Sequence, residues 1–306
     1  MDHIIVETGS RIHLGFIDPV GLSGRRWGSI GLYVKNPSLK IRVDKSEKIQ
    51  VNGPSWIDDL VRFIVEKLEV PGLKIECIEY IPRHVGLGSG TQAIFSIAYA
   101  ATKLYGIDYT LEELANLFRR CRRSGAGFWL FQKGGLVVDG GKSSENEIPP
   151  LLFRIDFPEE WIIVLGLPEN TSSRVYGDIE EKYMEDISRE GDPRNIAYTV
   201  LMKLIPSLVN RDFDGFTEAV EELDVETSRF FQKHQGGTYS YYSLSAVDVL
   251  KKAGVKGVGQ SSWGPTVYGF MEKKYVDDVV EKLRSVEGFR FIFTSPRNSG
   301  ATFSTD

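Results

Sequence analysis

Residues 81–91 read Ile-Pro-Arg-His-Val-Gly-Leu-Gly-Ser-Gly-Thr, and this stretch decides how the first half of the chain folds. The alternating residues 73–80 before it predict a strand, and residues 92–104 after it, apolar on nearly every side, predict a central helix. Three glycines within five residues let the backbone approach a ligand closely, and the N–H groups at the start of a helix attract an anion. We therefore predict a phosphate-binding loop formed by Gly86, Gly88, Ser89, Gly90 and Thr91.

The glycine spacing by itself leaves a second interpretation open, because tight strand-to-helix turns that bind nothing use the same residues. The segment is neither a P-loop nor a dinucleotide-binding fingerprint. It lacks the Gly-Lys-Ser/Thr ending of the first and the six-residue glycine spacing of the second.

Composition narrows the class of protein. The chain has 306 residues, 37 basic and 42 acidic side chains, a net charge of −5 and 42% apolar residues. The length predicts two domains, and the negative charge argues against binding of nucleic acid. No run of about 18 apolar residues is present, so we expect no membrane span. The start, Met1-Asp2-His3, shows no secretory leader, and Cys77 and Cys121 form no disulfide framework, so we expect a cytoplasmic protein.

The order of predicted elements indicates two α+β domains. Residues 142–150 end in Pro-Pro and are the best linker candidate, so we predict domains at 1–150 and 151–306. A buried strand at 161–167 is followed by acidic and helical stretches to about residue 225, including an amphipathic helix near 194–209. The last part predicts a helix at 240–253, strands at 256–262 and 266–271, a helix at 274–286 and a strand at 289–294. Together with the strand at 161, this is the β-α-β-β-α-β order of a split βαβ domain.

Capping signals place two helices in the first half. Ser55 is the predicted cap of a helix that Pro71-Gly72 ends. Thr110 with Glu113 forms a capping box for a helix that we expect to end in the arginines at 119–123.

The glycine segment resembles the second motif of the GHMP small-molecule kinases, P-x-x-x-G-L-G-S-S, with Gly90 where the second serine is usual. Residues 257–265, Gly-Val-Gly-Gln-Ser-Ser-Trp-Gly-Pro, resemble the third, glycine-rich motif of that family. The resemblance covers most of the chain. It implies an α+β fold with an N-terminal domain like domain 2 of ribosomal protein S5 and a ferredoxin-like C-terminal domain.

One position departs from the family pattern. Many of these kinases carry S-G-x-D, whose aspartate is the base for the accepting hydroxyl, whereas this chain has Ser124-Gly125-Ala126-Gly127. Glycine cannot accept a proton, so phosphoryl transfer by that route is disfavoured.

Several segments together resemble one branch of the family, the β-ribofuranosylaminobenzene 5′-phosphate synthases, archaeal enzymes of methanopterin-type pterin synthesis. These segments are residues 10–18, 24–31, 84–92, 122–127 and 296–301. The resemblance implies condensation of phosphoribosyl diphosphate with 4-aminobenzoate or 4-hydroxybenzoate to a C-riboside 5′-phosphate, with release of CO₂ and diphosphate. It also implies Mg²⁺ as a cofactor and a homodimer.

Arginines beside the glycine loops suit so anionic a donor, because guanidinium groups grip phosphate oxygens through paired hydrogen bonds. With the glycine loop, we expect the donor to be bound by Arg11, Arg25, Arg83, Arg123 and Ser124. Arg26 is predicted to stabilise charge on the departing diphosphate. In contrast, Arg119 and Arg120 at the predicted helix end are interpreted as solvated surface arginines.

Further candidates come from the same motifs. His13 and Asp18 join Arg26 as predicted catalytic residues, although a structural, hydrogen-bonded role for His13 explains its place equally well. Asp18 or Asp139 is the predicted ligand for Mg²⁺, which typically takes only one or two carboxylates. Trp27 and Trp263 are predicted platforms for the acceptor ring, with plain core packing as the alternative.

Two other functions stay open. An ATP-dependent GHMP kinase would phosphorylate a small alcohol, but Gly127 argues against it. A non-catalytic descendant would bind a ligand or partner and lose polar motif residues, yet the motif arginines and hydroxyls are present.

Overall fold

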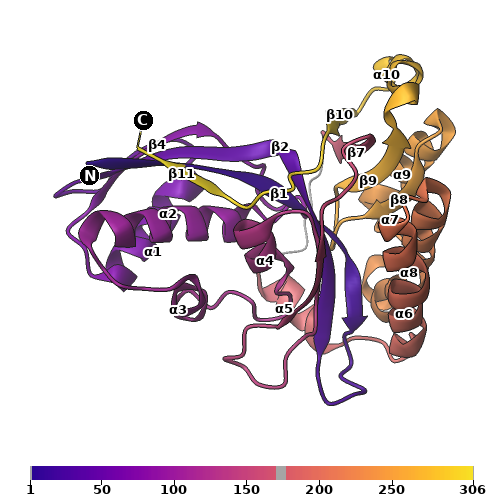
Figure 1. The fold of residues 1–306 in the computed structure, drawn as a ribbon, viewed down its shortest axis with the longest axis horizontal. Helices are drawn as coiled ribbons and strands as arrows, with labels where there is room; N and C mark the ends of the chain where they lie inside the picture. Colours follow the sequence, from indigo (N-terminus) through magenta and orange to yellow (C-terminus); the bar gives the residue numbers. More distant parts are fainter. Residues whose placement is uncertain (1, 170–176, 306) are drawn as a thin grey trace.

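A long antiparallel hairpin forms the backbone of the first half of the molecule. In the computed structural model, which describes residues 2–169 and 177–305, strands β1 (His3–Asp18) and β2 (Trp27–Lys45) pair along most of their lengths. Register shifts between Thr8 and Ser10 and between His13 and Gly15 mark bulges, which bend and twist a strand. The bent hairpin extends beyond the first sheet to the second half of the molecule, as Figure 1 shows in indigo.

Helices cover one face of the first sheet (Figure 1). The sheet runs β11-β1-β2-β4-β3, and β5 pairs with both β2 and β6. Its other strands are β3 (Gln50–Asn52), β4 (Leu73–Glu79), β5 (Leu136–Asp139), β6 (Leu151–Ile155) and β11 (Thr302–Ser304). The covering helices are α1 (Ser55–Leu68), α2 (Ser89–Tyr105), α3 (Leu111–Leu117) and α4 (Ala126–Lys133). α2 is buried on nearly every side, as its sequence predicts.

The second sheet confirms the predicted ferredoxin-like order. Its strands are β7 (Trp161–Pro168), β8 (Lys256–Gln260), β9 (Val267–Glu272) and β10 (Phe289–Thr294), in the antiparallel order β10-β7-β9-β8. The helices of this half are α5 (Asp178–Glu185), α6 (Pro193–Thr199), α7 (Ile205–Val209), α8 (Phe213–Gln235), α9 (Tyr241–Ala253) and α10 (Val276–Arg284). The part of the predicted acidic, helical stretch that falls on residues 170–176 lies outside the described residues.

The first sheet continues beyond the predicted boundary at residue 150. β6, at 151–155, pairs with β5, and the C-terminal β11 returns to pair with β1. Thus β6, just before the second sheet in the chain, and β11, just after it, are both strands of the first sheet. One apolar core cluster includes residues of both sheets.

Three local predictions need correction. The N-cap of α1 is Pro54, and Ser55 is the first residue of the helix. The capping box at Thr110 and Glu113 is confirmed, but its helix ends at Leu117 and not among the arginines. The predicted helix near 194–209 consists of α6 and α7 joined by a π-helical turn, Val200–Leu204. Within residues 2–169 and 177–305, we find no helix both long and apolar enough to cross a membrane.

Candidate active site

The two glycine-rich segments meet at the start of α2. Gly86 has a φ of +85°, and a Cβ there would lie 2.3 Å from the Ser261 carbonyl oxygen, so only glycine fits. The Ser261 hydroxyl donates to the Gly86 carbonyl at 2.7 Å. Gly88, at φ +75°, is the N-cap of α2, and no side chain in the described ranges caps that helix. The Thr91 N–H donates to the Gly88 carbonyl at 3.1 Å, so the N–H groups of Ser89 and Gly90 are the ones available to a ligand.

The glycine-loop pocket surrounds this helix start. It is lined by residues from both halves: Arg11, Arg83, His84, Gly86, Leu87, Gly88, Ser89, Gly90, Thr91, Arg120, Glu180, Ser262, Trp263 and Gly264. The buried Nε atoms of Arg11 and Arg120 have no hydrogen-bond partner in the described part of the chain. Burial lowers the pKa of Arg11 to about 10, while Glu180 raises it, so the guanidinium is charged at neutral pH. Unpaired cationic donors beside free helix N–H groups form a site for a phosphate or diphosphate.

Arg120 corrects the sequence interpretation, which placed it in solvent. The neighbouring Arg119 is exposed, as expected. Arg119 and Cys121 have φ values of +50° and +60°, and the chain therefore turns sharply after α3 instead of continuing as a helix. That turn leaves Arg120 half-buried with its Nε atom buried, and burial lowers its pKa.

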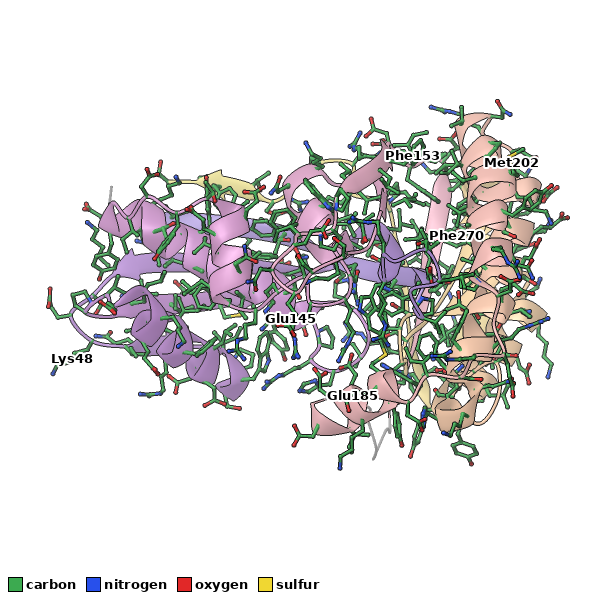
Figure 2. All side chains as sticks on the ribbon, turned by 90° about the horizontal axis from the view of Figure 1, so that it is seen from below. Lys48, Glu145, Phe153, Glu185, Met202 and Phe270 are labelled. Atoms are coloured by element: carbon green, nitrogen blue, oxygen red, sulfur yellow. The ribbon has the colours of Figure 1, made fainter. Side chains whose placement is uncertain are left out.

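The arginine pocket adjoins the glycine-loop pocket through Arg120. It is lined by Arg26, Trp27, Asn116, Arg119, Arg120, Arg122, Arg123, Lys142, Ser143, Ser144, Glu145, Asn146, Glu181, Met184 and Glu185. Figure 2 shows Glu145 and Glu185 in the middle of the molecule, between Lys48 at one end and Met202 at the other. Six arginine or lysine residues line this pocket against three glutamates, so it also suits an anion.

Arg26 and Trp27 act together at the wall of the arginine pocket. The Arg26 guanidinium carbon lies 4.4 Å from the centre of the Trp27 ring, and Nε donates to the Pro19 carbonyl at 2.7 Å. Burial and the nearby Arg123 lower the pKa of Arg26, whereas Asp18 raises it. Trp27 is 8% exposed, packs in the core and lies under the guanidinium groups of Arg26 and Arg123, so it supports cations; its role as a platform for the acceptor ring stays a prediction.

Helix α5 brings carboxylates to these arginines. Arg122 pairs with Glu181 at 2.9 Å, and Arg123 pairs with Glu180 at 3.2 Å and also with Glu181. Burial raises the pKa of Glu180, while Arg123 and Arg11 lower it. The carboxylates of α5 thus occupy part of the positive region that a phosphorylated substrate would enter.

A third, aromatic pocket lies between β1 and α8. Its lining residues are His13, Leu14, Gly15, Phe16, Met184, Asp224, Thr227, Ser228, Phe231, Gln235, Thr238, Gln260, Ser262 and Trp263. The Phe231 and Trp263 rings pack edge to face with their centres 5.3 Å apart. Burial, helped by Arg11, lowers the pKa of His13 well below its usual range, so its ring is neutral at neutral pH. His13 is therefore a hydrogen-bonding group and not a cationic acid.

The three pockets are neighbours. The aromatic and glycine-loop pockets share Ser262 and Trp263, the glycine-loop and arginine pockets share Arg120, and the arginine and aromatic pockets share Met184. A ligand with an anionic end and an aromatic end could therefore contact both kinds of site. Asp224, on α8, was missed by the sequence interpretation because an amphipathic helix carries no local signal for a buried acid.

Four predicted residues lie outside these three pockets: Arg25, Ser124, Asp18 and Asp139. Arg25 donates to the Gly140 and Gly141 carbonyls at 2.9 and 2.8 Å and pairs with Glu147. The Ser124 hydroxyl lies 2.6 Å from that of Ser29.

Both predicted metal ligands accept hydrogen bonds from backbone N–H groups. Asp18 accepts from the N–H groups of Gly21 and Ser23 and so closes the β1–β2 turn. Asp139 is fully buried and accepts from the N–H groups of Gly125 and Gly141, both at 3.0 Å, and burial raises its pKa to about 6. Neither lines any of the three pockets, and no group of three potential ligands occurs among the described residues.

Gly127 lies where the departure from the kinase pattern matters most. A Cβ at this position would be 3.2 Å from Thr91 Cγ2 and 3.9 Å from Arg11 Cδ. The aspartate of the kinases would thus stand beside the glycine-loop pocket, where this chain has glycine. The carboxylate that lines this pocket is that of Glu180, on α5.

Curated relatives identify the family. The protein named β-ribofuranosylphenol 5′-phosphate synthase from Methanothermobacter thermautotrophicus is 30% identical over 97% of this chain and 98% of its own length. The protein of the same name from Archaeoglobus fulgidus is 31% identical over 96% of this chain and 97% of its own. The chain belongs to the β-ribofuranosylphenol 5′-phosphate synthase family.

Family models and solved structures agree with this placement within the GHMP fold. The GHMP kinases N terminal domain matches residues 56–128, and the GHMP kinases C terminal domain matches residues 204–287. A homoserine kinase from Cytophaga hutchinsonii superposes with a TM-score of 0.68 at 14% identity, covering 99% of this chain and 98% of that one. A mevalonate diphosphate decarboxylase from Enterococcus faecalis gives 0.62 at 16% identity, covering 100% and 99%. The predicted GHMP-type α+β fold is confirmed, and the family is one of enzymes.

Proposed function

We propose that this enzyme condenses phosphoribosyl diphosphate with a 4-substituted benzoate, forming a β-ribofuranosyl C-riboside 5′-phosphate and releasing diphosphate and CO₂ in methanopterin-type pterin synthesis. The observation that carries the proposal is the juxtaposition of an anion site and an aromatic pocket, which share Trp263 and Ser262. The relatives are named for a phenol product, which favours 4-hydroxybenzoate over 4-aminobenzoate.

In this proposal the chain positions two substrates and stabilises charge. Arg11, Arg120 and the helix N–H groups bind phosphate oxygens of the donor, and Arg26 offsets charge on the leaving diphosphate. The C1–O bond breaks with its electron pair on diphosphate, and the ring carbon that bears the carboxylate attacks C1 from the opposite face, giving the β anomer. CO₂ then leaves, and its bonding pair restores the aromatic ring. No protein base takes a proton, in agreement with glycine at position 127.

In this proposal Mg²⁺ would bind together with the phosphoribosyl diphosphate donor. Since Asp18 and Asp139 are held by backbone N–H groups, the diphosphate itself would supply most ligands. The homodimer implied by the resemblance stays a prediction.

A product assay tests the proposal against its rival. Purified protein with Mg²⁺ is given phosphoribosyl diphosphate and either benzoate, and diphosphate release is measured. A parallel reaction supplies ATP with small alcohols and measures ADP. We expect diphosphate only when donor and benzoate are both present; ADP formation without diphosphate release would favour the GHMP kinase, which the retained glycine loop otherwise allows.

A further inference from the structure

The aromatic pocket contains a cluster of buried polar atoms that the proposed reaction leaves unused. Asp224 is 8% exposed, its Oδ1 accepts from the Gln260 N–H at 3.4 Å, and its Oδ2 has no hydrogen-bond partner in the described ranges. Thr227 Oγ1, one turn later on α8, and His13 Nε2 likewise have none there. Each buried polar group left without a partner costs about 1–3 kcal/mol, so three around one cavity indicate that a ligand's polar end belongs there.

The walls of the pocket select an aromatic ring. Phe16, Phe231 and Trp263 present their rings, with centres 6.2 Å apart for the first pair and 5.3 Å for the second. The cavity volume is about 50 Å³, on a scale where about 10–15 Å³ holds one water. A cavity of this size accommodates one substituted edge of a ring, and Trp263 connects it to the glycine-loop pocket because it lines both.

We propose that Asp224 is a catalytic residue that activates the acceptor, its carboxylate accepting a hydrogen bond from the 4-hydroxyl or 4-amino group of the benzoate. This inference rests on the proposed function and names a specificity-determining contact within the same site. In this orientation the carboxylate-bearing carbon, para to the held substituent, faces the donor.

The chemistry of the ring gives the hydrogen bond its role. When the new C–C bond forms, the ring becomes cationic, and most of that charge lies on the para substituent. An anionic acceptor on its N–H or O–H strengthens electron release from the substituent and so lowers the barrier. Loss of CO₂ returns an electron pair to the ring, and the substituent keeps its hydrogen, so no proton is consumed.

The surroundings of Asp224 shift the pH at which its carboxyl group ionises toward neutral pH. Burial raises its pKa to about 7, while Gln260 N–H, Tyr239 and Lys251 lower it and Glu221 raises it. The Tyr268 hydroxyl is also buried beside this cluster, and burial, helped by Asp224, raises its pKa well above the usual range. Because the carboxylate is the active form, the rate should increase as the pH rises through about 7.

Asp224→Asn tests the inference, with Glu218→Gln as a matched control, since Glu218 is exposed on the same helix. We expect kcat with 4-hydroxybenzoate to fall at least tenfold, the rise near pH 7 to disappear, and affinity for phosphoribosyl diphosphate to stay within twofold, which also reports correct folding. Glu218→Gln should retain activity and pH profile.

Substrate variation separates this role from a structural one. With 4-methoxybenzoate, whose oxygen has no hydrogen to donate, the ratio of wild-type to Asp224→Asn rates should fall toward one. An Asp224→Asn enzyme with unchanged kcat and pH profile would overturn the inference alone. A folded wild type that binds the donor but releases no diphosphate with either benzoate would overturn the proposed function as well.

Discussion

The glycine-loop pocket and the aromatic pocket share a wall at Trp263 but are built by opposite means. The first combines helix N–H groups with two unpaired guanidinium nitrogens in an open cleft, a pattern that attracts a polyanion. The second encloses a carboxyl and a neutral imidazole among rings, a pattern that suits a neutral ring with one polar substituent. The arginines thus lie on one side of Trp263, where Glu180 is the accompanying carboxylate, and Asp224 lies on the other.

Of the substitutions considered, a carboxylate added beside the glycine-loop pocket should have the largest effect on donor binding. A carboxylate at position 127 would lie beside Arg11, where opposite charges interact by about 3 kcal/mol at an effective dielectric constant near 20. We expect Gly127→Asp to weaken donor binding about a hundredfold, measured by calorimetry with phosphoribosyl diphosphate. Gly127→Asn has the same size without the charge and should weaken binding far less; equal losses would mean that crowding against Thr91, not charge, decides the effect.

Removing a cation from the same side should have the next largest effect. Arg120→Ala deletes a buried donor, and a hydrogen bond to a charged group contributes about 1.5–3 kcal/mol. The KM for phosphoribosyl diphosphate should rise tenfold to a hundredfold, with little change in KM for the benzoate. Arg62→Ala, which removes an exposed arginine paired with Asp58, is the control and should leave both constants unchanged.

Substitutions of the adjacent Arg25 and Arg26 should have smaller effects and should differ from each other. Arg26 lines the arginine pocket, whereas Arg25 is held by the Gly140 and Gly141 carbonyls and Glu147. Arg26→Ala should raise the donor KM about tenfold, because one charged contact is lost. Arg25→Ala should leave that KM within twofold and lower the free energy of unfolding by about 1 kcal/mol. Donor binding that survives Arg26→Ala unchanged would refute the role given to Arg26.

In the aromatic pocket, His13 should make the free energy of unfolding depend on pH. Because burial depresses the pKa of His13, the unfolded chain takes up a proton below pH 6.5 that the folded protein does not. This group lowers the free energy of unfolding as the pH falls, by about 1.4 kcal/mol at one unit below its unfolded pKa. Urea unfolding at pH 5.5 and 7.5 should show that part of the loss disappearing in His13→Gln. A pH dependence identical in both proteins would show that His13 ionises freely when folded.

Much of the fold could be predicted because its signals are local. Apolar alternation and the Thr110–Glu113 capping box need only neighbouring residues, and the ferredoxin-like order follows from such elements in sequence. The long hairpin could not be predicted in the same way. Glycines and arginines interrupt its apolar pattern between residues 9 and 31, and the pairing of β1 with β2 sustains the strands.

The site was predictable where the chain itself forms it and not where distant segments meet. The predicted phosphate-binding loop lines a pocket together with Arg11 and Arg83. Arg120 was misassigned because the turn after Leu117 depends on left-handed residues with no glycine to signal them. Asp18 and Asp139 looked available in sequence, but backbone N–H groups occupy both carboxylates.

Carbon dioxide release tests the central claim most directly. The enzyme with Mg²⁺, phosphoribosyl diphosphate and 4-hydroxybenzoate labelled in its carboxyl carbon should release labelled CO₂ and diphosphate in equal amounts, and no label without the donor. Diphosphate release with the label retained in the aromatic product would contradict attack by the carboxylate-bearing carbon. Release of neither, from folded protein that binds the donor, would contradict the proposed reaction as a whole.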